Sequence, residues 1–246
     1  MPHFEIACVI VFLASIVRGY TGFGFAAIAI SGLNLIWPAQ MSVPVTLFID
    51  VISAVRLLPS VRRHADMTMV KNLSMGAVAG IPIGLSMLLF IPDQPLKILI
   101  SGLILLMAVG LFFSPSFKIK ERAAYTRIVG GISGGFTAAA SVGGLPLICY
   151  LMSTAQNALV QRATVVVFLA CTDIVSIALL LLSDAVDLSI WKPVLLLLIP
   201  AVAGVQCGHW CFTRRPPKTY RTIALPILTL LSVVTLFYTS QQLLTS

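Results

Sequence analysis

The chain has 246 residues, of which 59% are apolar and 10% are charged, and its mean hydropathy is +1.03. Soluble domains have typically about 45–50% apolar and about 25% charged residues, so the composition excludes a water-soluble globular protein. The net charge of +8 does not indicate a nucleic-acid partner, because the basic residues stand in short clusters between apolar runs. We therefore predict an all-α polytopic membrane protein embedded in a lipid bilayer.

Eight apolar runs follow one another, four in each half of the chain. In chain order they are 4–36, 41–58, 71–91, 96–113, 128–151, 161–183, 191–212 and 220–241. The first run of each half is unusual. Run 4–36 is too long for one simple helix and is interrupted at Arg18-Gly19, and run 128–151 is rich in glycine. Each glycine costs about 1 kcal/mol relative to alanine inside a helix, so we expect both first runs to be broken or re-entrant.

The two halves of the chain repeat each other. The sequence AVAGIPIG at 77–84 returns as AVAGVQCG at 201–208, and DVIS at 50–53 returns as DIVS at 173–176. We predict one integrated membrane domain built from a first repeat over 1–113, a basic cytoplasmic linker over 114–127 and a second repeat over 128–246. A duplicated membrane unit is typical of transporters.

The loop charges favour an inverted arrangement of these repeats. If each first run is a hairpin that enters and leaves on one side, nearly all basic residues fall on one face, as cytoplasmic loops require. If each first run crosses once, the cluster from Arg214 to Arg221 moves outside. The hairpin model leaves three crossings per half, so the halves have opposite orientations. Eight simple crossings are the alternative.

The glycine-rich segments resemble a known family. GYTGFG at 19–24 with the apolar run that follows it, the segment from Gly134 through Gly144 to Pro146, and QRAT at 161–164 are similar to the signatures of the sulfite exporter TauE/SafE family, also called the toluene sulfonate uptake permease family. Phe25 and Ala26 in the first signature, and Ser141 and Leu145 in the second, replace glycines of the usual pattern. The resemblance implies transport of sulfite, an organosulfonate, or a related sulfur-containing or carboxylate anion.

The broken segments are candidates for an anion site, because small residues expose backbone N–H groups and half-helix N-termini carry partial positive charge. Arginine adds a planar fork matched to oxyanions. The candidate substrate-binding residues are Arg18, Thr21, Gly22, Gly24, Ser141, Gly143, Gly144 and Arg162. Close helix packing is the alternative for glycines, and snorkelling for the arginines. We expect packing for Gly80 and Gly204, with Gly80→Ala well tolerated.

Asp50 and Asp173 occupy equivalent positions of the repeats, inside runs where a carboxylate is expensive and usually functional or paired. One interpretation is that they couple substrate movement to a proton, with sodium as the other candidate coupling ion. The alternative is structural: the two carboxyl groups tie helices together, neutral or paired with arginine.

These features together predict a secondary active transporter of a small anion in the cell membrane, expected to be the bacterial inner membrane. No nucleotide-binding motif is present, and no cofactor or metal is expected, since Cys207, His209 and Cys211 lack further ligands nearby. The alternatives are a passive anion channel, which would lack the coupled carboxylates, and a membrane-embedded enzyme. The enzyme is less favoured, because the three histidines are scattered and no hydrolase or metalloprotease motif occurs.

Overall fold

A computed structural model describes residues 4–112, 122–154, 156–183 and 190–214. These residues form helices and contain no strand. The helices are α1 Phe4–Thr21, α2 Phe25–Leu33, α3 Ala39–Val61, the 3-10 turn η1 Arg62–His64, α4 Met67–Phe90, α5 Asp93–Phe112, α6 Ala123–Ala140, α7 Gly144–Met152, α8 Ala158–Leu182 and α9 Trp191–Arg214. The run 220–241 and most of the 114–127 linker lie outside the described residues.

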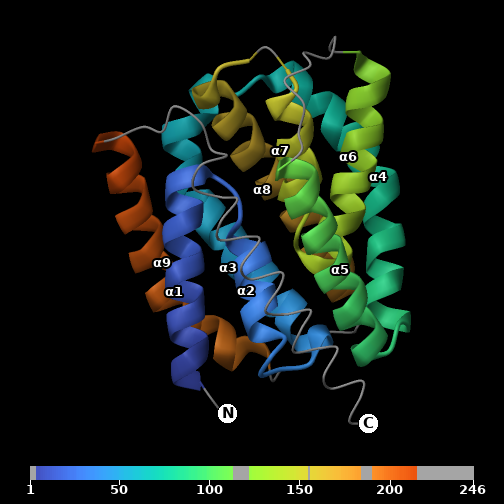
Figure 1. The fold of residues 1–246 in the computed structure, drawn as a ribbon, viewed down its shortest axis with the longest axis vertical. Coiled ribbons are helices and arrows are strands. Elements are labelled where there is room, and N and C mark those ends of the chain that lie inside the picture. The colour runs from blue at the N-terminus through green and yellow to red at the C-terminus, as the bar shows by residue number, and fades with distance from the viewer. Residues whose placement is uncertain (1–3, 113–121, 155, 184–189, 215–246) are drawn as a thin grey trace.

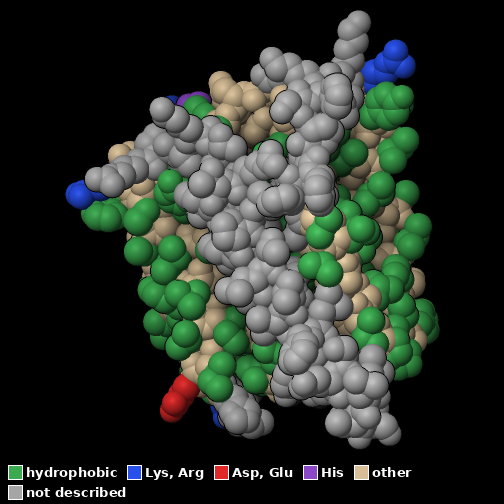
Figure 2. Space-filling view, in the orientation of Figure 1, with side chains coloured by type: hydrophobic (Ala, Val, Ile, Leu, Met, Phe, Trp, Pro, Cys, Tyr) green, Lys and Arg blue, Asp and Glu red, His purple; other side chains and the backbone are tan. Residues whose placement is uncertain are grey.

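Five of the described helices, namely α1, α3 with η1, α4, α8 and α9, are long and apolar enough to cross a membrane. Large apolar side chains are exposed along them, including Phe90, Leu182 and Ile199, as expected for surfaces that face lipid. Figure 2 shows hydrophobic side chains along the flanks of the molecule and charged side chains near its two ends. The all-helical membrane architecture expected from composition is thus confirmed.

Both glycine-rich first runs are interrupted, and each forms a helical hairpin. In the first, Gly22 and Gly24 have positive φ of 85° and 87°, which glycine adopts readily. The chain then returns, so that Gly32 of α2 lies against Ile10 of α1. In the second, Ser141 takes the left-handed conformation after α6. There Tyr150 of α7 comes back to Thr126 of α6, with 2.8 Å between their hydroxyl oxygens.

Two helix pairs join the halves of the chain through close backbone contact. On one side of Figure 1, α1 packs beside α9, and on the other, α4 packs beside α6. Glycines line both contacts: a Cβ added at Gly80 would overlap the backbone of Gly131, and one at Gly204 would overlap that of α1. The packing interpretation of these glycines is therefore correct. Our expectation that Gly80→Ala is mild is wrong, because no room exists for the methyl group.

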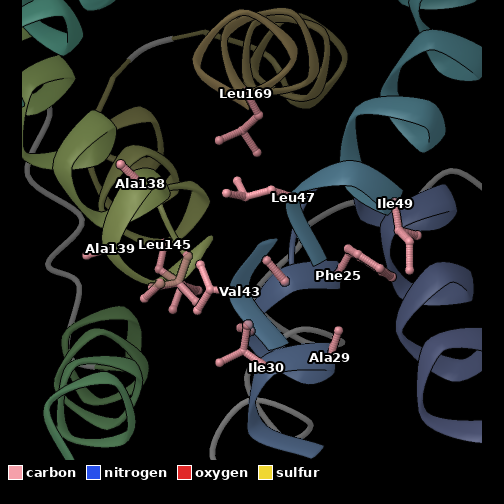
Figure 3. Packing of buried hydrophobic residues seen from close by; sticks show 14 of the residues in the cluster. Phe25, Ala29, Ile30, Val43, Leu47, Ile49, Ala138, Ala139, Leu145 and Leu169 are labelled. Carbon is pink, nitrogen blue, oxygen red and sulfur yellow. The ribbon is translucent and has the colours of Figure 1, made fainter. Parts of the chain in front are cut away.

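Between these pairs, α3 and α8 lie antiparallel at the centre. The Asp66 N–H, just after α3, donates to the Thr164 hydroxyl near the start of α8 at 3.1 Å. Further along, Asp50 of α3 meets Asp173 of α8. The half-helices α2 and α7 pack against this central pair. Figure 3 shows apolar side chains from α2, α3, α6, α7 and α8 converging there, and this core holds the polar groups described next.

Candidate functional site

A buried ion pair lies at the centre of the helix bundle. Arg18 Nη1 of α1 is 2.9 Å from Asp50 Oδ1 of α3, and the exposed fractions of the two side chains are 1% and 2%. Arg18 lies in the last turn of α1, next to the glycine turn, while Asp50 lies in the middle of α3. Charges removed from water so completely are costly, and they are usually kept for a functional reason.

Asp173 of α8 completes a triad with this pair. It is as buried as Asp50, and its carboxyl group interacts with that of Asp50 and with the Arg18 guanidinium. One guanidinium balances the charge of only one carboxylate. Because a second, unbalanced carboxylate is costly at such burial, we expect one of the two carboxyl groups to carry a proton.

Several polar atoms of this triad are unsatisfied. Among the described residues, Arg18 Nε, Arg18 Nη2 and Asp173 Oδ2 are buried and have no hydrogen-bond partner. The hydroxyl groups of Ser53 and Ser176, one turn beyond the aspartates in their repeats, are likewise buried without a partner in this part of the structure. Buried donors are nearly always satisfied in folded proteins, so two open guanidinium donors mark a place where a ligand or water can bind.

A small cavity adjoins Arg18 and Asp50. Its lining consists of Arg18, Gly24, Ala26, Ala27, Asp50, Ser141, Val142, Gly144, Leu145 and Leu169. The volume is about 10 Å³, which holds about one water molecule. The sulfur oxyanion expected from the sequence is larger than that, so the cavity as it stands is too small to hold it.

The N-termini of both half-helices face this cavity. Gly24 at the start of α2 lines it together with Ala26 and Ala27, and Gly144 and Leu145 line it from the first turn of α7. The first N–H groups of a helix lack partners within the helix, and the helix dipole adds partial positive charge at this end. Two such termini with one buried guanidinium make a region suited to an anion.

Three predicted binding residues shape the turns and do not line the cavity. The Thr21 hydroxyl lies 2.8 Å from the Val17 carbonyl and also bonds within the turn to Phe23. Gly22 packs against the Arg162 side chain. The Gly143 carbonyl accepts a hydrogen bond from Ser133, and a Cβ at Gly143 would overlap Thr137. Arg18, Gly24, Ser141 and Gly144 do line the cavity.

Arg162 lies away from this cavity, on the other side of the first glycine turn. Its Nη2 donates to the Gly19 carbonyl at 2.8 Å and lies 3.5 Å from His209 Nδ1. The guanidinium carbon stands 4.1 Å from the centre of the Phe212 ring. Arg162 is 3% exposed, so it does not snorkel to the surface. It lines a second cavity between the ends of α3, α8 and α9.

Sequence reasoning missed the apolar part of the lining. Ala26, Ala27, Val142 and Leu145 follow or lie between the predicted glycine and serine positions, so extending each motif by one helical turn would have found them. Leu169 precedes Asp173 by one turn of α8 and shares its face. The described residues contain no cluster of three potential metal ligands, and Cys207 and Cys211 stand on α9 without further ligands among those residues.

Comparison with known proteins identifies the family. The model of the sulfite exporter TauE/SafE family matches residues 7–235, which is nearly the whole chain. Neither the curated proteins nor the solved structures contain a match. The match agrees with the apolar spanning helices and with the resemblance of the glycine-rich segments. The chain belongs to the sulfite exporter TauE/SafE family and is a multi-pass membrane protein of a transporter type.

Proposed function

We propose that the protein is a secondary active transporter that binds a small oxyanion, such as sulfite or an organosulfonate, at Arg18. The observation that carries this proposal is the buried guanidinium with two open donors beside a cavity lined by two half-helix N-termini. Guanidinium presents two parallel N–H groups that match an oxyanion, and the N-termini add neutral donors. Gly24, Ser141 and Gly144 let the backbone approach the ligand closely.

The arrangement in the membrane is proposed as an inverted repeat. In such a repeat, α1 corresponds to α6 and α4 corresponds to α9. The contact between α1 and α9 is then equivalent to the contact between α6 and α4. Basic residues gather at one end of the molecule. At this end α3 and α9 finish, and α4, α6 and α8 begin. We call it the basic end; its cations are Arg62, Arg63, Lys71, Arg122, Arg127 and Arg214. By the positive-inside rule it faces the cytoplasm of a bacterial cell.

Hairpins that enter from opposite sides follow from this orientation. The α1–α2 hairpin begins and ends away from the basic end, and the α6–α7 hairpin begins and ends at it. Their turns meet in the interior, where Phe23 of the first turn lies against Gly144 at the start of α7. Irregular backbone is tolerated within a membrane only where protein or a water-filled cavity satisfies it. The meeting point of the turns is thus a natural substrate site.

Proton coupling is proposed to arise from competition for Arg18. An anion that binds Arg18 takes the place of Asp50, whose carboxylate then loses its counter-charge. Asp50 responds by taking up a proton, so that the Asp50–Asp173 pair holds two protons in place of one. Anion and proton are therefore bound together and released together. The hydroxyl groups of Ser53 and Ser176 stand next to this pair on the same helices.

The closed cavity favours a carrier over a passive channel. A carrier has to close around its ligand before it opens to the other side, whereas a channel requires a continuous path. Opening on either side would follow from movement of the half-helices α2 and α7 relative to the central pair α3 and α8. The direction of net transport then depends on the gradients of the anion and the proton.

The proposal is tested by uptake into proteoliposomes that contain the purified full-length protein. Sulfite, organosulfonates, carboxylates and inorganic anions are compared, with and without an imposed pH gradient. We expect saturable uptake of at least one sulfur oxyanion or sulfonate, stimulated by the gradient and lost in Arg18→Gln. Uptake that grows linearly with concentration and ignores the pH gradient would indicate a channel instead.

A further inference from the structure

The second cavity, at the basic end, has the features of a separate binding site. Its volume is about 240 Å³, far larger than that of the closed central cavity. Arg162, Phe212 and His209 line it, while exposed His64 and Thr213 stand at its mouth. The cavity therefore combines a buried guanidinium with an opening toward solvent.

The charges around this cavity favour a negatively charged ligand. Arg62, Arg63 and Arg214 are exposed at the same end of the molecule, and Arg214 is held over the Trp210 ring at 4.0 Å. The acidic residue closest in the chain, Asp66, does not line the cavity. Its carboxylate accepts from the Met69 N–H at 2.9 Å and from Gln156 at 2.9 Å. Clustered cations raise the local concentration of anions at such an opening.

Arg162 connects this cavity to the first glycine turn. Its guanidinium bonds to the carbonyl of Gly19, and its side chain packs against Gly22. The residues on the other side of the turn, Arg18 and Gly24, line the central cavity. The α1–α2 turn therefore separates the two cavities, and Arg162 contacts this turn from the side of the basic end.

We propose that the basic-end cavity is a second anion site, in which Arg162 and His209 bind a small oxyanion. The anion competes with the Gly19 carbonyl for the guanidinium, and this competition loosens the end of α1 next to Arg18. Anion binding in the basic-end cavity thereby makes movement of the α1–α2 turn easier. The binding site goes beyond the proposed central site and does not require that Arg18 binds an anion.

The test measures equilibrium binding of radiolabelled sulfite to the full-length protein in nanodiscs, with chloride at equal ionic strength as the competing salt. An Arg18→Gln background removes the central counter-charge, so the remaining binding reports on the basic-end site. We expect this background to keep saturable sulfite binding. Adding Arg162→Gln should weaken it at least tenfold, and Arg162→Lys less.

Arg162→Gln also removes the hydrogen bond to the Gly19 carbonyl near the end of α1, so a second variant that keeps this bond is needed. Thr213→Trp fills the mouth without touching the Arg162–Gly19 bond, and it should also weaken binding at least tenfold. Cys207→Trp, at an exposed position of α9 outside the cavity lining, is the matched control and should leave binding within twofold. Loss of all sulfite binding in Arg18→Gln, or residual binding that neither Arg162→Gln nor Thr213→Trp changes, would overturn the proposal.

The test also separates this proposal from the proposed function. A protein that binds sulfite at the basic end but shows no uptake in proteoliposomes would retain the second site and refute the transport of that anion. Gradient-driven uptake that Thr213→Trp leaves unchanged in rate and in KM would refute the second site and retain the transporter.

Discussion

The centre of the molecule and its two lateral helix pairs are built from opposite principles. In the centre, Arg18 and Asp173 carry buried polar atoms that have no partner among the described residues. In the lateral pairs, α4 with α6 and α1 with α9, glycine lets backbone touch backbone and leaves no space. The comparison teaches that unsatisfied buried polar groups indicate a candidate ligand site, whereas close packing of small residues indicates a structural contact between helices.

The largest expected effect is at Arg18. Losing the buried charged partner of a bound anion costs about 2–5 kcal/mol of binding free energy, so Arg18→Gln should reduce anion uptake at least about thirtyfold. Arg18→Lys keeps the charge but loses the planar fork and should retain a minor part of the rate. Initial rates in proteoliposomes measure this, with Lys192→Gln, at an exposed position at the start of α9, as control. Uptake within tenfold of wild type in Arg18→Gln would remove Arg18 from the site.

The carboxyl pair should affect coupling more than transport itself. Asp50→Asn removes the carboxylate that takes up the proton when the anion binds, so accumulation driven by a pH gradient should disappear in this variant. Asp173→Asn removes the neighbouring carboxyl group and should weaken that accumulation. Exchange of labelled for unlabelled anion at equilibrium should persist, because Arg18 remains. Accumulation is compared with exchange in the same vesicles. If both variants keep full gradient-driven accumulation, the aspartates are structural and another ion drives transport.

The lateral pairs should respond through stability. Gly80→Ala places a methyl group against the Gly131 backbone, and such overpacking costs about 1–3 kcal/mol. Gly102→Ala on α5 is the matched control, because a Cβ there meets nothing within 4 Å. We expect a lower Tm for Gly80→Ala and an unchanged or slightly higher Tm for Gly102→Ala. Equal Tm values would show that the two helices separate easily, contrary to a rigid pair.

The smallest expected effect concerns the size of the central cavity. Leu169 lies against Gly144, so Leu169→Ala enlarges the closed site. We expect the preference for a bulkier sulfonate over sulfite to rise by a factor of about two to ten, as for about one or two methylene groups in a pocket. Leu180→Ala on the same helix removes an equally buried leucine outside the cavity lining. A preference that shifts equally in both variants would reflect general loosening and not the site.

The sequence predicted the membrane class, the interruptions in both glycine-rich runs and the presence of charged residues inside apolar helices. These follow from signals that need no tertiary contact: apolar composition, glycine density, and an isolated charge within an apolar run. The repeat of DVIS as DIVS predicted equivalent positions for Asp50 and Asp173. Their direct contact depends on how α3 crosses α8, which the spacing of residues along the chain does not determine.

The roles of individual glycines were the part that the sequence could not separate. Gly24 permits a left-handed turn, Gly80 permits helix contact and Gly143 fits beneath Thr137, yet all three stand in similar apolar surroundings in the sequence. Arg18 and Arg162 both stand beside glycine motifs. Only the packing of α8 against the first glycine turn shows that Arg162 bonds to Gly19 while Arg18 pairs with Asp50.

The most direct test of the central claim is the affinity of the Asp50→Asn variant for its transported anion. If the anion and Asp50 compete for Arg18, removing the carboxylate should strengthen anion binding by about tenfold, equivalent to about 1.4 kcal/mol. Titration calorimetry of wild type and variant in the same detergent measures this, with proton uptake read from the dependence of the heat on the buffer. We expect tighter binding together with loss of the proton uptake that accompanies binding in wild type. Weaker binding in Asp50→Asn, or unchanged proton uptake, would contradict the competition between anion and carboxylate.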